Sequence, residues 1–206
     1  MPDSSTRQER SFEIRSDEVN GPLDLVETIL SAQTSEPEWL KDGTSFTDIE
    51  LLDGIPVKYT LNQKGGVNVF SINARFMTSS PSERTVVQLR NHLTKVLGLD
   101  DDIGVFYHAF LNDKPLSLAF SRLRGLRLMR GTNLYESLIC SILSQNNSAR
   151  LWNRTARLMM QYYGEKVGFP DGTSSFLFPS AETLAKLKPR ELQARTSMGY
   201  RAKPVV

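Results

Sequence analysis

Cysteine and histidine are scarce in this chain of 206 residues, which contains one cysteine and two histidines. The chain therefore has no Cys/His set for zinc, and we expect no metal site. The lone Cys140 has no supporting histidine and Asn/Asp pattern, which indicates a structural thiol in a reducing compartment. No glycine-rich phosphate loop stands before a helix in the right context, so we also expect no cofactor.

Long apolar runs are missing as well. No stretch is long enough to span a bilayer, and the amino-terminal MPDSSTRQER is polar and charged, unlike a signal peptide. Internal repeats and low-complexity tracts are also absent. A hydrophobic content of 39% and a charged content of 23% are typical of a soluble globular protein with one or two domains. These absences exclude a membrane-spanning protein and a disulfide scaffold.

Charge is divided unevenly along the chain. Residues 1–114 contain 11 Lys and Arg against 18 Asp and Glu, a net charge of −7. Residues 115–206 contain 14 against 5, a net charge of +9. A polyanionic partner would therefore meet the carboxy-terminal part, although such charges can also be merely solvating.

The first half of the chain predicts a small antiparallel sheet with helices. Alternating apolar and polar residues around a glycine turn are typical of a hairpin. The expected strands are an edge strand at residues 11–15 and a sheet over residues 39–74, with a hairpin of strands at 55–62 and 67–74. Ser80 is the expected cap of a helix that ends at Leu97 and packs on the sheet, with Pro81 as its first residue.

From about residue 100 the pattern is almost entirely helical. The expected helices lie at residues 102–111, 115–123, 132–143, 148–163, 180–187 and 189–196. Residues 164–178 are rich in Gly, Ser and Pro and predict a loop. The fold class is therefore α+β, with an antiparallel sheet-plus-helix domain over residues 1–99 and a helical domain over residues 100–206.

Two of these helices are joined by a short polar elbow, residues 144–148, with the sequence SQNNS. The apolar face of the first helix consists of Leu134, Leu138, Ile139, Ile142 and Leu143. The second helix carries an arginine stripe, Arg150, Arg154 and Arg157. Amides, hydroxyls and an arginine near a helix amino terminus suit phosphates and base edges. The same residues also occur as ordinary caps and as a solvated helix face.

Four segments, taken in order, resemble the helix-hairpin-helix superfamily of DNA base-excision glycosylases, especially its branch of 8-oxoguanine and 3-methyladenine DNA glycosylases. The segments are Gly125–Arg130, Ser144–Arg150, Phe178–Ser180 and Met198–Lys203. Their order and approximate spacing match from about Phe106 to Lys203, and the amino-terminal half matches more loosely. The resemblance implies the same α+β fold, with the DNA site on the helical domain.

The resemblance further implies an enzyme that flips a damaged base, an oxidised or alkylated purine, out of duplex DNA. Gln145 and Asn146 would fill the vacated space, and Arg150 and Arg201 would hold the partner base. Tyr200 would insert as a stacking wedge, although a residue in this position after Gly199 can also simply cap a helix. The expected DNA-binding residues are Gln145, Asn146, Asn147, Arg150, Tyr200, Arg201 and Lys203.

One further position concerns base recognition. Ala32 stands where 8-oxoguanine enzymes typically have a glycine whose backbone carbonyl reads the oxidised base. A carbonyl can serve from alanine, but its methyl group leaves base specificity open.

The family's catalytic apparatus is expected beyond this chain. The glycine-rich hairpin, the catalytic aspartate and, in bifunctional members, a lysine follow the segment that matches Gly199–Lys203, whereas this sequence ends at Val206. We therefore assign no catalytic residue and expect a chain truncated before the hairpin, with residues 204–206 departing from the family's helix.

The predicted function is that of a base-excision DNA N-glycosylase, with or without AP lyase activity. Because the catalytic region is absent from this chain, we expect the chain alone to be inactive. The expected partner is double-stranded DNA with a damaged base, bound by a monomer that has no membrane partner. Its expected location is the cytoplasm at the nucleoid, or the nucleus in a eukaryote. Two alternatives are a non-catalytic damaged-DNA-binding module and a helical domain whose arginines meet an acidic protein.

Overall fold

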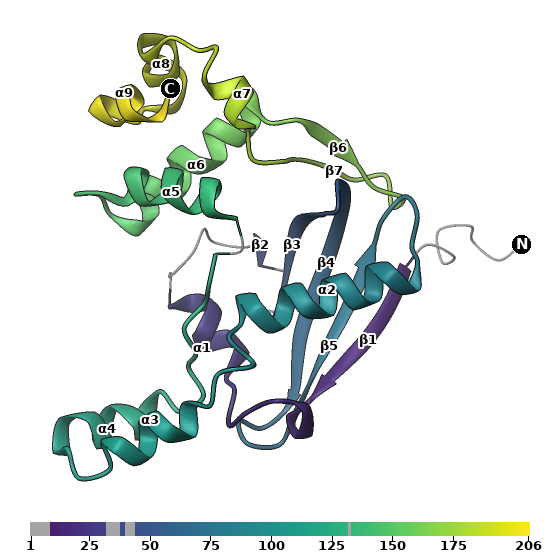
Figure 1. The fold of residues 1–206 in the computed structure, drawn as a ribbon, viewed down its shortest axis with the longest axis vertical. Coiled ribbons are helices and arrows are strands. Elements are labelled where there is room, and N and C mark those ends of the chain that lie inside the picture. Colours follow the sequence, from purple (N-terminus) through teal and green to yellow (C-terminus); the bar gives the residue numbers. More distant parts are fainter. Residues whose placement is uncertain (1–8, 32–37, 40–43, 132) are drawn as a thin grey trace, which may run out of the picture. The chain divides into compact units, whose positions relative to one another are not determined.

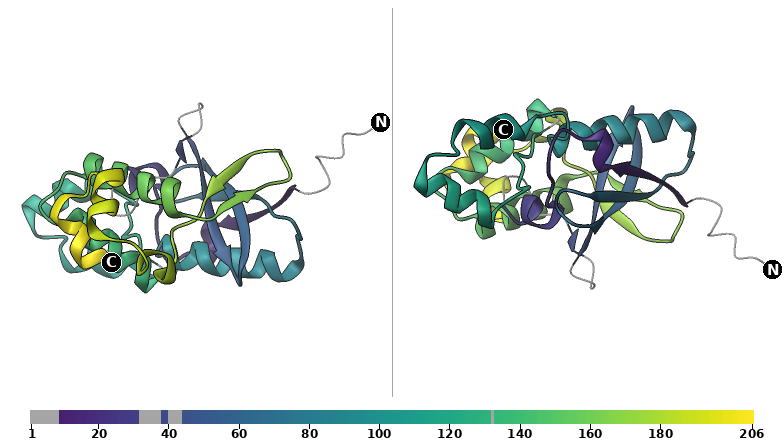
Figure 2. Two further views of the ribbon diagram at one scale, coloured as in Figure 1. Left: turned by 90° about the horizontal axis from the view of Figure 1, so that it is seen from above. Right: turned by 90° about the horizontal axis from the view of Figure 1, so that it is seen from below.

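The computed structural model describes residues 9–31, 38–39, 44–131 and 133–206 and divides into two compact units. Unit 1 comprises residues 1–130 and unit 2 comprises residues 131–206, and each is described by itself (Figures 1 and 2). The predicted domain boundary between residues 99 and 100 falls inside unit 1, and the domain assignment stays a prediction. Among the described helices, none is both long and apolar enough to cross a membrane.

Unit 1 is built on a five-stranded antiparallel sheet with the order β1-β5-β4-β3-β2. The strands are β1 (Glu9–Arg15), β2 (Glu38–Trp39), β3 (Ser45–Leu52), β4 (Ile55–Gly65) and β5 (Phe70–Met77). The predicted α+β class, the edge strand and the hairpin are confirmed. The hairpin turn comes later than predicted, because β4 continues to Gly65, where φ is +87° and the Gly66 N–H donates to the Val69 carbonyl.

One face of this sheet forms the core of unit 1. Alternate residues of β4 and β5, such as Leu61, Ile72 and Phe76, are almost completely buried. Helix α2 (Glu83–Val96) lies along this face and contributes Leu89 and Leu93 to the same cluster (Figure 1). The sequence therefore predicted the packing of this helix correctly.

The cap of α2 differs from the prediction. Ser82, not Ser80, is the N-cap: its Oγ accepts from the Thr85 N–H at 3.1 Å, and the Thr85 hydroxyl accepts from the Ser82 N–H at 3.3 Å. This reciprocal capping box satisfies the backbone N–H groups of both Ser82 and Thr85.

The segment after α4, residues 123–130, bonds to the start of α1 and to the end of α2 and belongs to unit 1. The remaining helices of the unit are η2 (Ser16–Glu18), α1 (Leu25–Leu30), α3 (Ile103–Ala109) and α4 (Lys114–Arg122). The Gly125 carbonyl accepts from the Asp24 N–H at 2.8 Å, and the Arg130 N–H donates to the Val96 carbonyl at 2.9 Å. Between these bonds Arg127 is only 1% exposed.

Helices α3 and α4 pack on each other through aromatic rings. The Phe120 ring lies edge-on to Phe106 and Tyr107, with centroid distances of 5.3 and 5.0 Å. No described residue of either helix is buried, and Phe106 is 49% exposed. This pair is therefore held by local contacts and leaves apolar surface in solvent.

His92 of α2 predicts a pH dependence of stability. Burial lowers the pKa of this imidazole from 6.5 to about 4, and this outweighs the Glu50 carboxylate, 3.5 Å from Nε2, which favours the protonated ring. Between these two pKa values the unfolded chain binds more protons than the folded one, so stability falls as the pH drops through this window. At 1.36 kcal/mol per unit, acidification from pH 7 to 4 removes about 3 kcal/mol through His92.

Urea unfolding of the protein and of His92→Gln at pH 7 and pH 4.5 measures this effect. We expect the variant to lose less stability on acidification than the wild type. Equal losses would show that another group controls the acid sensitivity.

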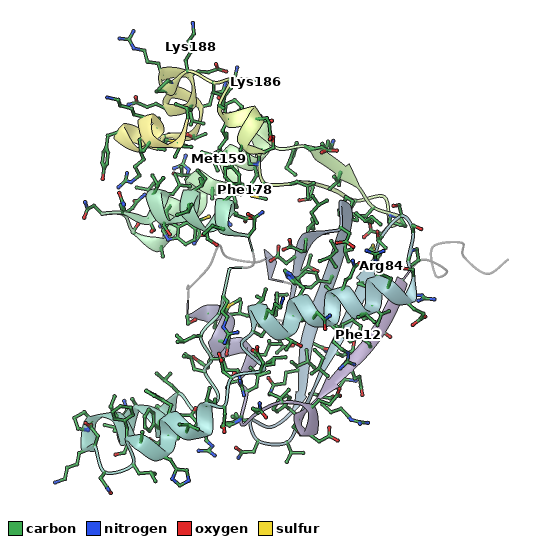
Figure 3. The ribbon with its side chains drawn as sticks, in the orientation of Figure 1. Phe12, Arg84, Met159, Phe178, Lys186 and Lys188 are labelled. Atoms are coloured by element: carbon green, nitrogen blue, oxygen red, sulfur yellow. The ribbon has the colours of Figure 1, made fainter. Side chains whose placement is uncertain are left out.

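Unit 2 consists of short helices and a small hairpin around a second core (Figure 1). Its elements are α5 (Leu134–Ser144), α6 (Ala149–Tyr163), β6 (Lys166–Gly168), β7 (Ser174–Phe176), α7 (Ala181–Leu184), α8 (Pro189–Thr196), η3 (Gly199–Arg201) and α9 (Ala202–Val205). Leu143, Met159 and Leu192 are fully buried in its core, against which Phe178 packs; Met159 and Phe178 are labelled in Figure 3. The predicted helices of this region are present.

Two predictions for unit 2 are wrong. The predicted loop at residues 164–178 contains the β6–β7 hairpin, whose turn is closed by Asp171 accepting from the Thr173 N–H. Residues 204 and 205 belong to α9 and do not depart from a helix. Pro204 fits there because it stands in the first turn, where its missing N–H would have no helical acceptor.

The apolar face of α5 is narrower than its sequence pattern predicts. Ile139 and Leu143 are buried, whereas Leu134 and Leu138 are 76% and 55% exposed. The first turn of α5 instead depends on Asn133, whose side chain accepts from the backbone N–H groups of Tyr135 and Glu136.

Candidate nucleic-acid interface

The elbow between α5 and α6 is a tight turn with polar side chains on its outside. Asn146 has a φ of +47°, a conformation that asparagine tolerates better than most residues. The Asn147 side chain donates to the Leu143 carbonyl at 3.0 Å, and Ser148 caps α6 by accepting from the Leu151 N–H at 3.3 Å. The side chains of Gln145 and Asn146 remain exposed.

The wedge segment, residues 198–203, is anchored from one side. Met198 and Ala202 are buried in the core of unit 2 together with Val205, at spacings of four and three residues. Tyr200 lies on the opposite side and is 65% exposed. Gly199 has a φ of +62°, which glycine adopts without strain, so the chain can leave α8 and begin η3 here.

Arg201 joins this wedge segment to the elbow. Its Nε donates to the Gln145 carbonyl at 3.0 Å, and its Nη2 donates to the carbonyls of both Gln145 and Asn146, the latter at 3.1 Å. The guanidinium carbon also lies 4.6 Å from the centroid of the Tyr200 ring. The structure therefore brings together Gln145, Asn146, Tyr200 and Arg201, four of the five residues predicted to share one face. The fifth, Arg150, stands exposed in the first turn of α6, and its place in the group stays a prediction.

Basic side chains give unit 2 as a whole a positive charge. Residues 131–206 contain ten Lys and Arg against five Asp and Glu, a net charge of +5. The exposed basic residues include Arg150, Arg154, Arg157, Lys186, Lys188 and Lys203. Lys188 points outward from the start of α8, as Figure 3 shows. Such a surface attracts a polyanion.

The sequence is similar to that of a probable N-glycosylase/DNA lyase. No protein-family model matches the chain. A probable N-glycosylase/DNA lyase of Methanothermobacter thermautotrophicus is 31% identical over 164 residues, which are 80% of this chain and 49% of that protein. The chain therefore spans about half the length of this relative.

Solved structures with the same fold come from two kinds of DNA glycosylase. The structure of MBOgg1 with a low-affinity DNA ligand aligns with a TM-score of 0.73 over 94% of this chain and 59% of its own, at 20% identity. The apo-form of the Clostridium acetobutylicum 8-oxoguanine glycosylase/lyase aligns with a TM-score of 0.70 over 96% and 62%, at 19% identity. The 3-methyladenine DNA glycosylase of Archaeoglobus fulgidus reaches 0.69 over 95% and 65%, at 17% identity.

The chain has a DNA glycosylase-like fold, that of the matching part of these structures. This confirms the fold predicted from the four matching segments. Two of those segments form the candidate interface: residues 144–150 contain the elbow, and residues 198–203 form the wedge segment. Residues 178–180 have a structural place, since Phe178 packs on the core and Ser180 caps α7.

The roles of individual residues in this glycosylase fold stay predictions. Asn147 is half-buried and uses its amide nitrogen inside the elbow, whereas Arg150 stands exposed in the first turn of α6. Ala32, the predicted base-recognition residue, lies outside the described residues. The bonds from Arg201 to the elbow were not foreseen, and nothing in the local sequence signals a contact between residues 56 positions apart.

Proposed function

We propose that this chain is the DNA-binding part of a base-excision glycosylase, which binds duplex DNA at a damaged purine or at the gap that an extruded base leaves. The observation that carries the proposal is the exposed group of Tyr200, Gln145 and Asn146, held together by Arg201 on a basic unit. The glycosylase fold and the N-glycosylase/DNA lyase relative support it.

The chemistry of base excision requires such a group. A target base must leave the stack, which costs a few kcal/mol, before its glycosidic bond becomes accessible. An exposed aromatic ring recovers part of this cost by stacking in the gap, by roughly 1–3 kcal/mol per base. Amide side chains beside the ring can pair with the groups that the missing base leaves behind, because they donate and accept hydrogen bonds.

The lesion class is an oxidised or alkylated purine. The similar solved structures include an 8-oxoguanine enzyme and a 3-methyladenine enzyme. Competition among duplexes that carry 8-oxoguanine, 3-methyladenine or an unmodified purine tests this class. Equal binding to all three duplexes would contradict the proposal that the protein recognises a damaged purine.

Binding to DNA should depend steeply on salt. Each phosphate neutralised by Lys or Arg contributes about −0.9 to the slope of log K against log salt. Three contacts from the basic residues of unit 2 therefore predict a slope of about −2.7. Fluorescence anisotropy from 50 to 200 mM salt measures the slope, and an acidic polypeptide serves as competitor. A flat salt dependence, or displacement of DNA by the acidic polypeptide at equal charge concentration, would favour the acidic-protein alternative.

Tyr200→Ala should weaken binding to a gap more than binding to intact duplex. Only the gap offers a stacking site, so we expect affinity for a duplex with an abasic-site analogue to fall about tenfold. Affinity for the intact duplex should change less than about twofold, because the phosphate contacts are unaffected. Tyr162→Ala is the matched control, since Tyr162 is also exposed and lies near an arginine, Arg195, 5.5 Å from its ring centroid. Equal losses on both duplexes, or an equal effect of the control, would exclude the wedge role.

A further inference from the structure

Most of the N–H donors of Arg201 bond to acceptors within the protein. A guanidinium has five N–H donors. The bonds to the Gln145 and Asn146 carbonyls use Nε–H and the two hydrogens of Nη2. These bonds leave the two N–H groups of Nη1 for an acceptor on DNA. A two-pronged grip on a base through Nε and Nη2 would require the bonds to the elbow to break.

The position of the two carbonyls explains why a cation belongs there. Gln145 is the C-cap of α5, where the last carbonyls of the helix lack helical donors and carry the negative end of the helix dipole. The left-handed backbone of Asn146 turns the next carbonyl toward the same guanidinium. Arg201 therefore closes the end of α5 and fixes the turn from which the Gln145 and Asn146 side chains project.

The guanidinium of Arg201 also contacts the ring of Tyr200. Its central carbon lies 4.6 Å from the Tyr200 ring centroid, within the range of a cation–π contact. Tyr200 is otherwise 65% exposed, and the core contacts of its segment come from Met198 and Ala202 rather than from the ring. The Arg201 guanidinium thus contacts both the elbow and the wedge.

We infer that Arg201 is a positioning residue that locks the wedge to the elbow before DNA arrives. Tyr200, Gln145 and Asn146 then enter a gap in the duplex as one preformed unit, and the ordering of these side chains does not have to occur on binding. This inference rests on the proposed function, because it concerns how the same group of residues recognises a gap.

Lysine cannot replace arginine in this role. It retains the positive charge, but its ammonium is a point charge without the planar fork that holds two carbonyls while stacking on a ring. Arg201→Lys therefore removes the contacts to the two carbonyls and the ring but retains the charge. Lys203→Gln is the matched control, because Lys203 is exposed two residues further along the same wedge segment.

The test measures the affinity of each variant for an abasic-analogue duplex and for an intact duplex at several salt concentrations. In Arg201→Lys the ratio of affinities for the gapped and the intact duplex should fall about tenfold, as in Tyr200→Ala. The salt slope should stay unchanged. Lys203→Gln should keep the preference and lower the slope by about 0.9. The double variant Tyr200→Ala/Arg201→Lys should be no weaker on the gap than either single variant, within about twofold, because both changes remove the same function.

A spectroscopic readout separates positioning from general stability. A 2-aminopurine base beside the gap reports stacking of the Tyr200 ring, and its fluorescence should be less quenched by Arg201→Lys than by the wild type at saturating protein. The inference is overturned if Arg201→Lys retains the gap preference and the quenching, or if the two changes in the double variant add independently. A wild type that shows no preference for the gap would refute the proposed function itself, and the inference with it.

Discussion

We expect residues 1–206 to bind gapped duplex DNA but to release no base from it. Cleavage of the glycosidic bond needs a carboxylate that stabilises the developing cation on the sugar, or an amine that displaces the base. The carboxylates of unit 2 are Glu136, Glu165, Asp171, Glu182 and Glu191. Glu136, Glu182 and Glu191 stand in the first turns of α5, α7 and α8, where a negative charge complements the helix dipole.

The other two acids have no better claim. Asp171 accepts from the N–H and the hydroxyl of Thr173 and closes the β6–β7 turn. Glu165 is exposed just before β6. Lys203 is exposed in the wedge segment, and we expect it to contact a phosphate.

Single-turnover assays with excess protein test this expectation on duplexes with 8-oxoguanine, an alkylated purine or uracil. The Clostridium acetobutylicum 8-oxoguanine glycosylase/lyase is the positive control for the 8-oxoguanine substrate. Base release by this chain, abolished by changing Lys203 or one of the five acids, would place an active site within it.

Arg127→Met should destabilise the protein by about 4 kcal/mol. The change removes four hydrogen bonds in a buried site, and each such loss costs at least about 1 kcal/mol. The Arg127 guanidinium donates to four backbone carbonyls, those of Asn20 at 2.6 Å, Pro22 at 3.1 Å, Gly98 at 2.5 Å and Asp101 at 3.0 Å. Burial lowers its pKa, and the nearby carboxylate of Asp101 opposes this shift. Methionine fills similar space but removes all four bonds. The Gly98 and Asp101 carbonyls keep weaker backbone donors, the N–H groups of Asp101 and Ile103, whereas the Asn20 and Pro22 carbonyls lose the guanidinium.

Arg130→Met is the matched control for this change. Arg130 lies three residues further on and pairs with Asp100 and Asp101 at the surface, where its side chain is 42% exposed. Exposed pairs of this kind contribute little, so its loss should be much smaller. Equilibrium unfolding in urea compares the two variants, and equal losses would contradict the role given to the buried guanidinium.

Local signals in the sequence were sufficient for most elements of the fold. The predicted helix starts at residues 102, 148, 180 and 189 lie within one residue of the observed starts of α3, α6, α7 and α8. The β6–β7 hairpin escaped prediction because its strands have three residues each and are too short for an alternating pattern.

Long-range contacts of charged residues could not be predicted from the sequence. Arg127 stands in a segment that matches the glycosylases but had no predicted role, and Arg201 was predicted to hold the partner base. The partners of both are backbone carbonyls, which any residue supplies and which the sequence therefore does not signal. Their positions depend on segments far apart in the chain that tertiary structure brings together. The candidate interface was found through the order of its motifs, whereas the mechanism that holds it together required the structure.

The central claim is that this chain recognises a gap in duplex DNA through Tyr200 and the elbow. The most direct measurement is the ratio of wild-type affinities for an abasic-analogue duplex and the same intact duplex at 150 mM salt. Stacking of one ring and pairing of the elbow amides predict a preference of at least about tenfold. Equal affinities, with binding controlled by salt alone, would contradict the claim and leave only a basic surface.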